Sequence, residues 1–348
     1  MPLQRALLCT LGPTSLNERV IAQLEQIGAT RFRINMSHTD VGDLERIIQF
    51  VQKCTKVPIS IDTEGARLRT GNMSDGVGVV EGAKVRLVQE AFWGDAFAVP
   101  IVPGSAVQQL TPGALVSIDF DAVVLRVDAV TDSSADTTVI SGGDIGSRKA
   151  VTAYPSPRLP TFSEKDSIAT RIARKNGVNE FALSFCENRE AVAQFREMTG
   201  PDATIVSKIE SQQGVQNLEE ILASTDRILI DRGDLSREVR IEGIPLLQKA
   251  IIRRANAKKI PAYVATNLLE SMITRRVPTR AEVNDVINTL MDGADGLVLA
   301  GETAIGKYPV EAARMIATLM NEYVRFLDGN RLEELLGDPP LASYRGLD

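Results

Sequence analysis

Eight short apolar segments alternate with eight amphipathic segments along this chain. The alternation predicts an α/β fold in which eight parallel strands and eight helices close into a (βα)8 TIM barrel. An open doubly wound sheet is the alternative, but the number of repeats and the absence of a glycine-rich turn after the first apolar segment favour the barrel. The alternation breaks once, after the third predicted strand, where short β-type runs and turns indicate an inserted all-β domain.

The predicted strands are apolar runs rich in aliphatic and β-branched residues, at 5–10, 29–34, 57–62, 179–184, 203–208, 226–230, 260–265 and 296–300. The predicted helices carry apolar residues at helical spacing, at 15–27, 41–54, 164–176, 187–198, 214–223, 243–258, 280–292 and 309–327. One helix start is marked by a capping box, since Thr279 precedes Arg280 and Glu282 follows at the third helical position.

Residues 72–155 lose the helical periodicity and contain turn signals such as Thr111-Pro112-Gly113. The sequence therefore predicts a TIM-barrel catalytic domain over 1–71 plus 156–328 and an inserted β-barrel domain over 72–155. An inserted domain at the mouth of a barrel is expected to act as a lid. The remaining segment, 329–348, is predicted to be a tail.

The composition excludes several functional classes. The chain has 348 residues, of which 44% are hydrophobic, and a formal net charge of −6 without a basic block. Nucleic acid is therefore not an expected partner, and no apolar run is long enough for a membrane span. Three widely spaced cysteines fit reduced thiols and a cytoplasmic protein. The single histidine, His38, argues against a histidine-ligated metal or a serine–histidine triad.

Polar residues end two successive predicted strands. The run 204–208 ends in Lys208 and is followed by Glu210, and the run 226–230 is followed by Arg232 and Asp234. Ligands bind at the carboxyl ends of parallel strands, so we expect these groups to share one rim. Glu210 and Asp234 suit Mg²⁺ or Mn²⁺, and Lys208 and Arg232 suit an anion such as phosphate. A purely structural ion network remains the alternative.

Other strand ends extend this expectation. Arg33 and Arg69 can clamp a phosphoryl group, and the N–H groups of Gly233 and Asp234 can hold a carboxylate. Four further residues at strand ends offer oxygen atoms and only one charge: Asn35, Ser37, Asp62 and Thr63. Such a set suits a monovalent cation, but a hydrogen-bonded pair of strands explains it equally well.

In this order, the motifs resemble those of the pyruvate kinase family over about residues 6–327. The resemblance is carried by Arg33-Ile34-Asn35-Met36-Ser37-His38, Asp62-Thr63-Glu64-Gly65, Ser207-Lys208-Ile209-Glu210, Arg232-Gly233-Asp234-Leu235 and Gly301-Glu302-Thr303-Ala304. It implies a glycolytic phosphotransferase that moves a phosphoryl group between phosphoenolpyruvate and ADP, or between ATP and pyruvate, with Mg²⁺ or Mn²⁺. A homodimer is also expected.

The resemblance assigns a role to each matching residue. It implies that Lys208 stabilises the transferring phosphoryl group and the enolate, that Arg33 contacts phosphate, and that Thr266 lies near the site of enolate protonation. Substrate would also contact Gly233 and Asp234. The divalent ion would be held by Glu210 and Asp234, and potassium by Asn35, Ser37, Asp62 and Thr63. The nucleotide side would include Arg69, Lys149 and Asn35.

Departures from the family pattern leave alternatives open. The family usually has alanine at the position of Asp231 and glutamate at the position of Arg67, and its nucleotide-side motifs are altered here. A different acceptor, lyase chemistry on a pyruvate enolate, or a non-catalytic binding protein are the competing interpretations. We expect Arg67 to reduce the need for potassium, since family members that work without this ion carry a basic residue there. The family's carboxyl-terminal domain is not matched, so no activation by sugar bisphosphates is expected.

Overall fold

The protein is described here from a computed structural model that covers residues 5–119 and 121–328. The chain divides into two compact units. The first comprises Met1–Thr63 and Glu164–Asp348, and the second comprises Glu64–Ser163. The second unit is wider at both ends than the range 72–155 expected from the sequence. The predicted tail, 329–348, lies outside the described residues.

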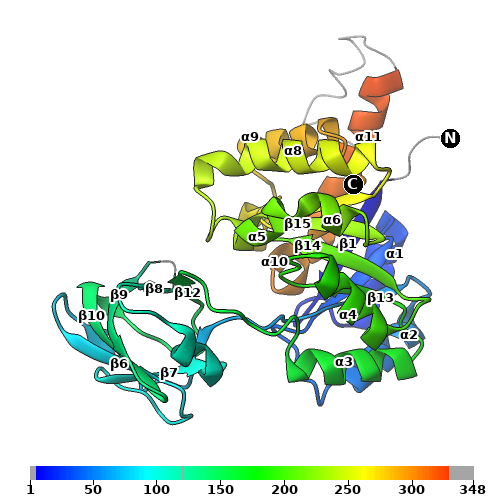
Figure 1. The fold of residues 1–348 in the computed structure, drawn as a ribbon. Helices are drawn as coiled ribbons and strands as arrows, with labels where there is room; N and C mark the ends of the chain where they lie inside the picture. The colour runs from blue at the N-terminus through cyan, green and yellow to red at the C-terminus, as the bar shows by residue number, and fades with distance from the viewer. Residues whose placement is uncertain (1–4, 120, 329–348) are drawn as a thin grey trace. The chain divides into compact units, whose positions relative to one another are not determined.

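A closed barrel of eight parallel strands forms the centre of the first unit and confirms the predicted TIM barrel (Figure 1). The strands, in barrel order, are β1 (Ala6–Leu11), β17 (Gly296–Leu299), β16 (Ala262–Ala265), β15 (Arg227–Asp231), β14 (Thr204–Ile209), β13 (Glu180–Leu183), β3 (Ile59–Asp62) and β2 (Arg31–Asn35). A cluster of buried side chains that includes Leu8, Val206 and Val298 packs together within this unit. Burial of such apolar runs is what made the strands recognisable in the sequence.

Helices follow the strands, and the longer ones bury part of their surface. The longer ones are α1 (Glu18–Ile27), α2 (Leu44–Cys54), α3 (Glu164–Lys175), α4 (Arg189–Thr199), α8 (Ile244–Ala257), α9 (Arg280–Met291) and α11 (Pro309–Asp328). The short ones are α5 (Gln212–Gln216), α6 (Leu218–Leu222), α7 (Arg232–Leu235), α10 (Gly301–Ala304), η2 (Ile241–Gly243) and η3 (Glu270–Ile273). The predicted capping box between Thr279 and Glu282 is present at α9.

One predicted helix is wrong in detail. The segment expected at 214–223 is two short helices, α5 and α6, which meet at Asn217. The Asn217 side chain donates to the carbonyl of Glu187 at 2.8 Å. Asparagine readily bonds to backbone groups outside a regular helix, and this contact accompanies the break.

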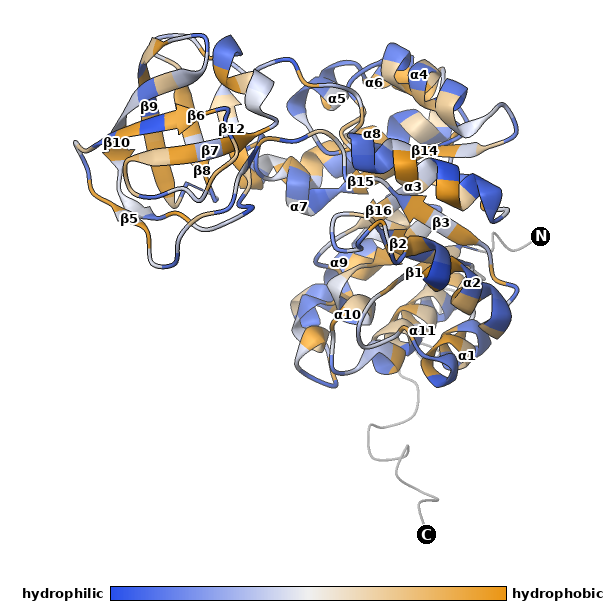
Figure 2. Cartoon of the chain, turned by 90° about the horizontal axis from the view of Figure 1, so that it is seen from below, coloured by the Kyte–Doolittle hydropathy of each residue, from blue (hydrophilic) through white to orange (hydrophobic). Residues whose placement is uncertain are grey.

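The second unit is built from strands. A seven-stranded sheet has the order β12 (Val151–Tyr154), β8 (Leu115–Ile118), β9 (Val123–Val130), β10 (Ser134–Ser141), β6 (Lys84–Val88), β7 (Ala98–Val102) and β4 (Arg69–Thr70). A two-stranded sheet pairs β11 (Gly143–Asp144) with β5 (Gly78–Val79), and a short helix, η1, spans Gly104–Gln109. The second unit has an apolar core of its own, which includes Leu87, Val99 and Leu125. Figure 2 shows hydrophobic residues along several of its strands.

The second unit is inserted in the sequence between two barrel strands that are hydrogen-bonded to each other. Strand β3 pairs directly with β13, with Asp62 opposite Ala182. The barrel therefore continues across the insertion without a gap. Within 5–119 and 121–328, none of the helices combines the length and the apolar composition that a bilayer span requires.

Candidate active site

Buried charged side chains gather at the carboxyl-terminal part of strands β2, β3, β14 and β15. All of them are at most 4% exposed: Arg33, Asp62, Lys208, Glu210 and Asp231. The carboxyl ends of barrel strands share one rim, which explains why residues so distant in sequence meet here. A charge buried to this extent requires a partner, so the pairing within the group decides its chemistry.

Lys208 is the shared cation of this group. Its Nζ lies 3.0 Å from Glu210 Oε2, 3.4 Å from Asp231 Oδ2 and 3.5 Å from Asp62 Oδ1. Burial lowers the pKa of Lys208, but attraction by Asp62, Glu210 and Asp231 outweighs burial and raises the pKa above its ordinary value. Lys208 is therefore a fixed positive charge and does not act as a base.

Only part of the Arg33 guanidinium group has a partner in the described part of the chain. Its Nη2 lies 2.8 Å from Asp62 Oδ2. Its Nε and Nη1 are buried and have no hydrogen-bond partner among the described residues. Leaving buried donors unsatisfied costs about 1–3 kcal/mol, a cost that an anionic ligand or water at this position would remove. The phosphate-binding role expected of Arg33 remains a prediction.

Three carboxylates form an oxygen cluster. Glu210, Asp231 and Asp234 each bring one oxygen within 4.8 Å of the others. Burial raises the pKa of Asp231, but the charges of Lys208 and Arg33 outweigh it, so that the pKa is lowered and the carboxylate stays ionised. Ionised oxygen ligands on neighbouring strand ends suit a hard divalent cation. The residues present therefore fit Mg²⁺ or Mn²⁺.

Sequence reasoning did not place Asp231 in the site. Its position could have identified it, because Asp231 is the last residue of β15 and lies three residues before Asp234. Phe185 was also missed. Its backbone N–H donates to Glu210 Oε1 at 2.7 Å, and its ring centroid lies 6.0 Å from Lys208 Nζ.

Arg232, which the sequence offered as an anion-binding residue, is bonded within the protein. Its Nη1 lies 2.7 Å from Asp285 Oδ2, and its Nη2 donates to the Thr266 carbonyl at 2.7 Å. Asp234 is paired with Arg237, whose Nη1 lies 3.1 Å from Asp234 Oδ1. Glu210 therefore contacts Lys208, whereas Asp234 contacts Arg237 and not Arg232.

Thr266 is held in an unusual backbone conformation next to the carboxylates. Its φ is 70°, which is a genuine outlier for a β-branched residue and costs about 1–3 kcal/mol. Its hydroxyl accepts from Gly233 N–H at 2.8 Å and lies 3.2 Å from Asp231 Oδ1, to which it can donate. The Gly233 N–H, which the sequence offered to a substrate carboxylate, is thus already used by Thr266.

Three of the four residues expected to bind a monovalent cation, Asn35, Asp62 and Thr63, have side-chain oxygens that are bonded or ion-paired within the chain. Asn35 Oδ1 accepts from Ser37 N–H at 2.9 Å. The Thr63 hydroxyl donates to Ala182 O at 3.0 Å, and Asp62 is paired with Arg33. These contacts match the alternative of a hydrogen-bonded strand pair.

In the second unit, the two predicted nucleotide contacts have partners of their own. Lys149 Nζ lies 2.7 Å from Asp119 Oδ2, and Arg69 Nη1 donates to Arg148 O at 3.3 Å.

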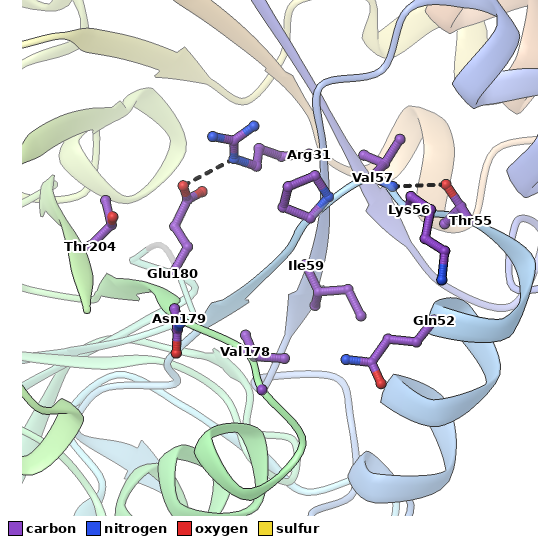
Figure 3. A pocket seen from close by; sticks show the side chains of 12 residues that line it. Arg31, Gln52, Thr55, Lys56, Val57, Ile59, Val178, Asn179, Glu180 and Thr204 are labelled. Carbon is purple, nitrogen blue, oxygen red and sulfur yellow. Dashed lines mark hydrogen bonds and ion pairs between the residues drawn. The ribbon is translucent and has the colours of Figure 1, made fainter. Parts of the chain in front are cut away.

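A cavity of about 550 Å³ lies at the opposite end of the barrel, where strands β2, β3 and β13 begin (Figure 3). Arg31 and Glu180 line it and form an ion pair at 3.0 Å. None of the predicted site residues lines this cavity, so it is separate from the charged cluster.

Comparison with known proteins agrees with the residues that carry the resemblance. Residues 3–313 match the family model described as "Pyruvate kinase, barrel domain". The chain is 34% identical to a pyruvate kinase of Geobacillus stearothermophilus over 88% of this chain, but spans only 55% of that protein. It is 34% identical to one of Thermotoga maritima and 32% identical to one of Clostridium perfringens, over 92% and 96% of this chain and 71% and 73% of theirs. The chain belongs to the pyruvate kinase family.

Proposed function

We propose that the chain transfers a phosphoryl group between phosphoenolpyruvate and ADP, and in reverse between ATP and pyruvate. The observation that carries the proposal is Lys208, a buried and permanently charged ammonium held among three carboxylates beside the unsatisfied donors of Arg33. Phosphoryl transfer needs positioning and charge neutralisation more than covalent chemistry, and these groups supply both.

We infer that Glu210 and Asp234 hold the Mg²⁺ or Mn²⁺ ion, because both belong to the cluster of oxygens within 4.8 Å of one another. When bound, the ion neutralises charge on the phosphoryl oxygens and on the enolate oxygen. Asp234 Oδ1 also lies 3.1 Å from Arg237 Nη1, so the ion would share this carboxylate with the arginine.

The protein's own groups have distinct proposed roles. Lys208 stabilises negative charge on the transferring group and on the enolate, and Arg33 directs its free donors to phosphate. Thr266 lies beside the carbon that gains a proton, and Gly233 and Asp234 border the substrate carboxylate. The strained Thr266 backbone supports this role, because such strain persists where the surrounding structure enforces it.

The nucleotide and monovalent-cation assignments are also proposals. Arg69 and Lys149 of the second unit, together with Asn35 of the barrel, would serve the nucleotide side. We propose that potassium is not required and that Arg67 supplies the equivalent charge. The support is that Asp62, the only charged member of the expected potassium ligands, is already paired with Arg33 at 2.8 Å.

A homodimer is the proposed assembly. Exposed apolar side chains in η2 and at the start of α8 support an interface there, since Ile241 is 76% and Leu246 is 70% exposed. Light scattering tests this, and a monomer at micromolar concentration would contradict it.

The catalytic proposal is tested by following ATP formation from phosphoenolpyruvate and ADP with Mg²⁺. We expect ATP to accumulate in the wild type and a Lys208→Met variant to be about 10²–10³-fold slower. Consumption of phosphoenolpyruvate that does not depend on ADP would instead favour a different acceptor. Absence of any consumption, combined with retained oxalate binding, would favour a binding protein.

A further inference from the structure

Asp231 lies inside the charged cluster, not at its edge. It is 4% exposed, its Oδ2 lies 3.4 Å from Lys208 Nζ, and its Oδ1 lies 3.2 Å from the Thr266 hydroxyl. It therefore contacts the cation proposed to stabilise the phosphoryl group and the side chain proposed to lie beside the enolate. We propose that Asp231 sets the electrostatic balance of this site, so that it strengthens divalent-cation binding and weakens the binding of multiply charged anions.

The charge balance supports this role, which rests on the proposed function. Among the contacts that the structure describes here, a network of seven charged side chains carries a formal charge of −1: Lys208, Arg33, Arg237, Asp62, Glu210, Asp231 and Asp234. A divalent cation changes this to +1. Without the carboxylate of Asp231, the same site would be neutral when empty and +2 with the cation.

This difference acts on ligands in proportion to their charge. A polyanion such as phosphoenolpyruvate meets half the positive charge that the site would present without Asp231. The same carboxylate reduces the binding free energy of a singly charged anion, such as pyruvate, by a smaller amount. Asp231 is thus a specificity-determining residue that shifts the site away from highly charged anions and towards pyruvate-like ones.

Asp231→Asn isolates the charge from the shape. Asparagine has nearly the same size, and its carbonyl oxygen can still accept from Thr266. Asp231 also stands at the N-cap of α7, a position that asparagine fills as well as aspartate. Asp231→Ala removes the charge without introducing an amide, and it serves as the second variant.

Direct binding measurements by isothermal titration calorimetry test the proposal. For Asp231→Asn we expect Mn²⁺ to bind about a hundredfold more weakly, which is about tenfold per unit of ligand charge. At saturating Mn²⁺, pyruvate should bind about tenfold and oxalate about a hundredfold more tightly than to the wild type. Asp231→Ala should show the same dependence on ligand charge.

Glu219→Gln is the matched control. Glu219 is exposed, its Oε2 lies 2.8 Å from Lys258 Nζ, and its replacement changes the formal charge of the protein by the same amount. Solvent and salt screen such a surface charge, so no affinity should change by more than about twofold.

Equal shifts for pyruvate and oxalate, or weaker binding of both, would overturn the role of Asp231. Failure of both Asp231 variants to fold would also overturn it, because the residue would then be structural. These outcomes are independent of turnover. A chain that makes no ATP but shows the charge dependence refutes the phosphotransferase proposal alone, whereas turnover without the dependence refutes only the role of Asp231.

Discussion

Replacing Lys208 by methionine leaves three buried carboxylates without their shared cation. Lys208 Nζ lies 3.0–3.5 Å from oxygens of Glu210, Asp231 and Asp62. Removing one partner of a buried ion pair costs about 3–5 kcal/mol, since the remaining charges stay buried. For a unit of this size, 1 kcal/mol shifts the melting temperature by about 2–4 °C, so we expect a decrease of about 6–20 °C.

Differential scanning calorimetry with EDTA and with Mg²⁺ measures this effect. Because the variant's cluster is one unit more negative, Mg²⁺ should raise its melting temperature more than that of the wild type. Lys175→Met is the control, since Lys175 pairs with Glu45 at 3.3 Å on the surface, where such pairs contribute at most about 1 kcal/mol. The reasoning is refuted if Lys208→Met melts within 2 °C of the control, or if Mg²⁺ stabilises all three proteins equally.

The site and the buried thiols lead to four further predictions. Asp234→Ala should abolish Mn²⁺-dependent binding of oxalate in calorimetry, and an unchanged affinity would remove Asp234 from the metal site. Exchanging potassium for tetramethylammonium should change the rate of ATP formation by less than about twofold, whereas a large stimulation by potassium would contradict the role proposed for Arg67. Burial raises the pKa of the Cys9 and Cys186 thiols from 9.0 to about 12, so both should resist a thiol reagent at pH 8 until the protein unfolds. Because these pKa values are raised on folding, the thiols' contribution to stability is present below pH 9 and is lost as pH rises to about 12. Between pH 9 and about pH 12, the melting temperature should therefore fall less steeply in a Cys9→Ala/Cys186→Ala variant than in the wild type. An equal dependence of melting temperature on pH in the two proteins would contradict this.

The barrel and the position of its site were predictable because both follow from periodicity. Buried parallel strands appear as continuous apolar runs, and the polar residues that end or follow each run mark the rim. This rule alone brought Lys208, Glu210 and Asp62 to one place, where the structure shows them in contact.

The pairing of side chains within the rim was not predictable. Arg232 and Asp234 are two residues apart, yet the first turn of α7 directs them to different partners, Asp285 and Arg237. Strand periodicity contains no information about such a turn. The break at Asn217 was missed for a similar reason, because a side-chain contact with Glu187 accompanies it.

The direct pairing of β3 with β13 has a consequence for how the protein folds. Barrel closure joins Ala6 to Gly296, and the pairing of β3 with β13 joins Asp62 to Ala182, so the contact of Lys208 with Asp62 depends on pairing between distant parts of the chain. The cost of closing a loop grows slowly, by about 0.6 kcal/mol for each doubling of its length, so a whole folded unit can occupy the loop between β3 and β13 at little expense in stability. Long-range pairing is nevertheless slow to form. Glu210, Asp231 and Asp234 come from the adjacent strands β14 and β15 and from α7, so a divalent cation can be taken up by this segment before the barrel closes. The contact of Lys208 with Asp62, in contrast, forms only after β3 has paired with β13 across the inserted unit.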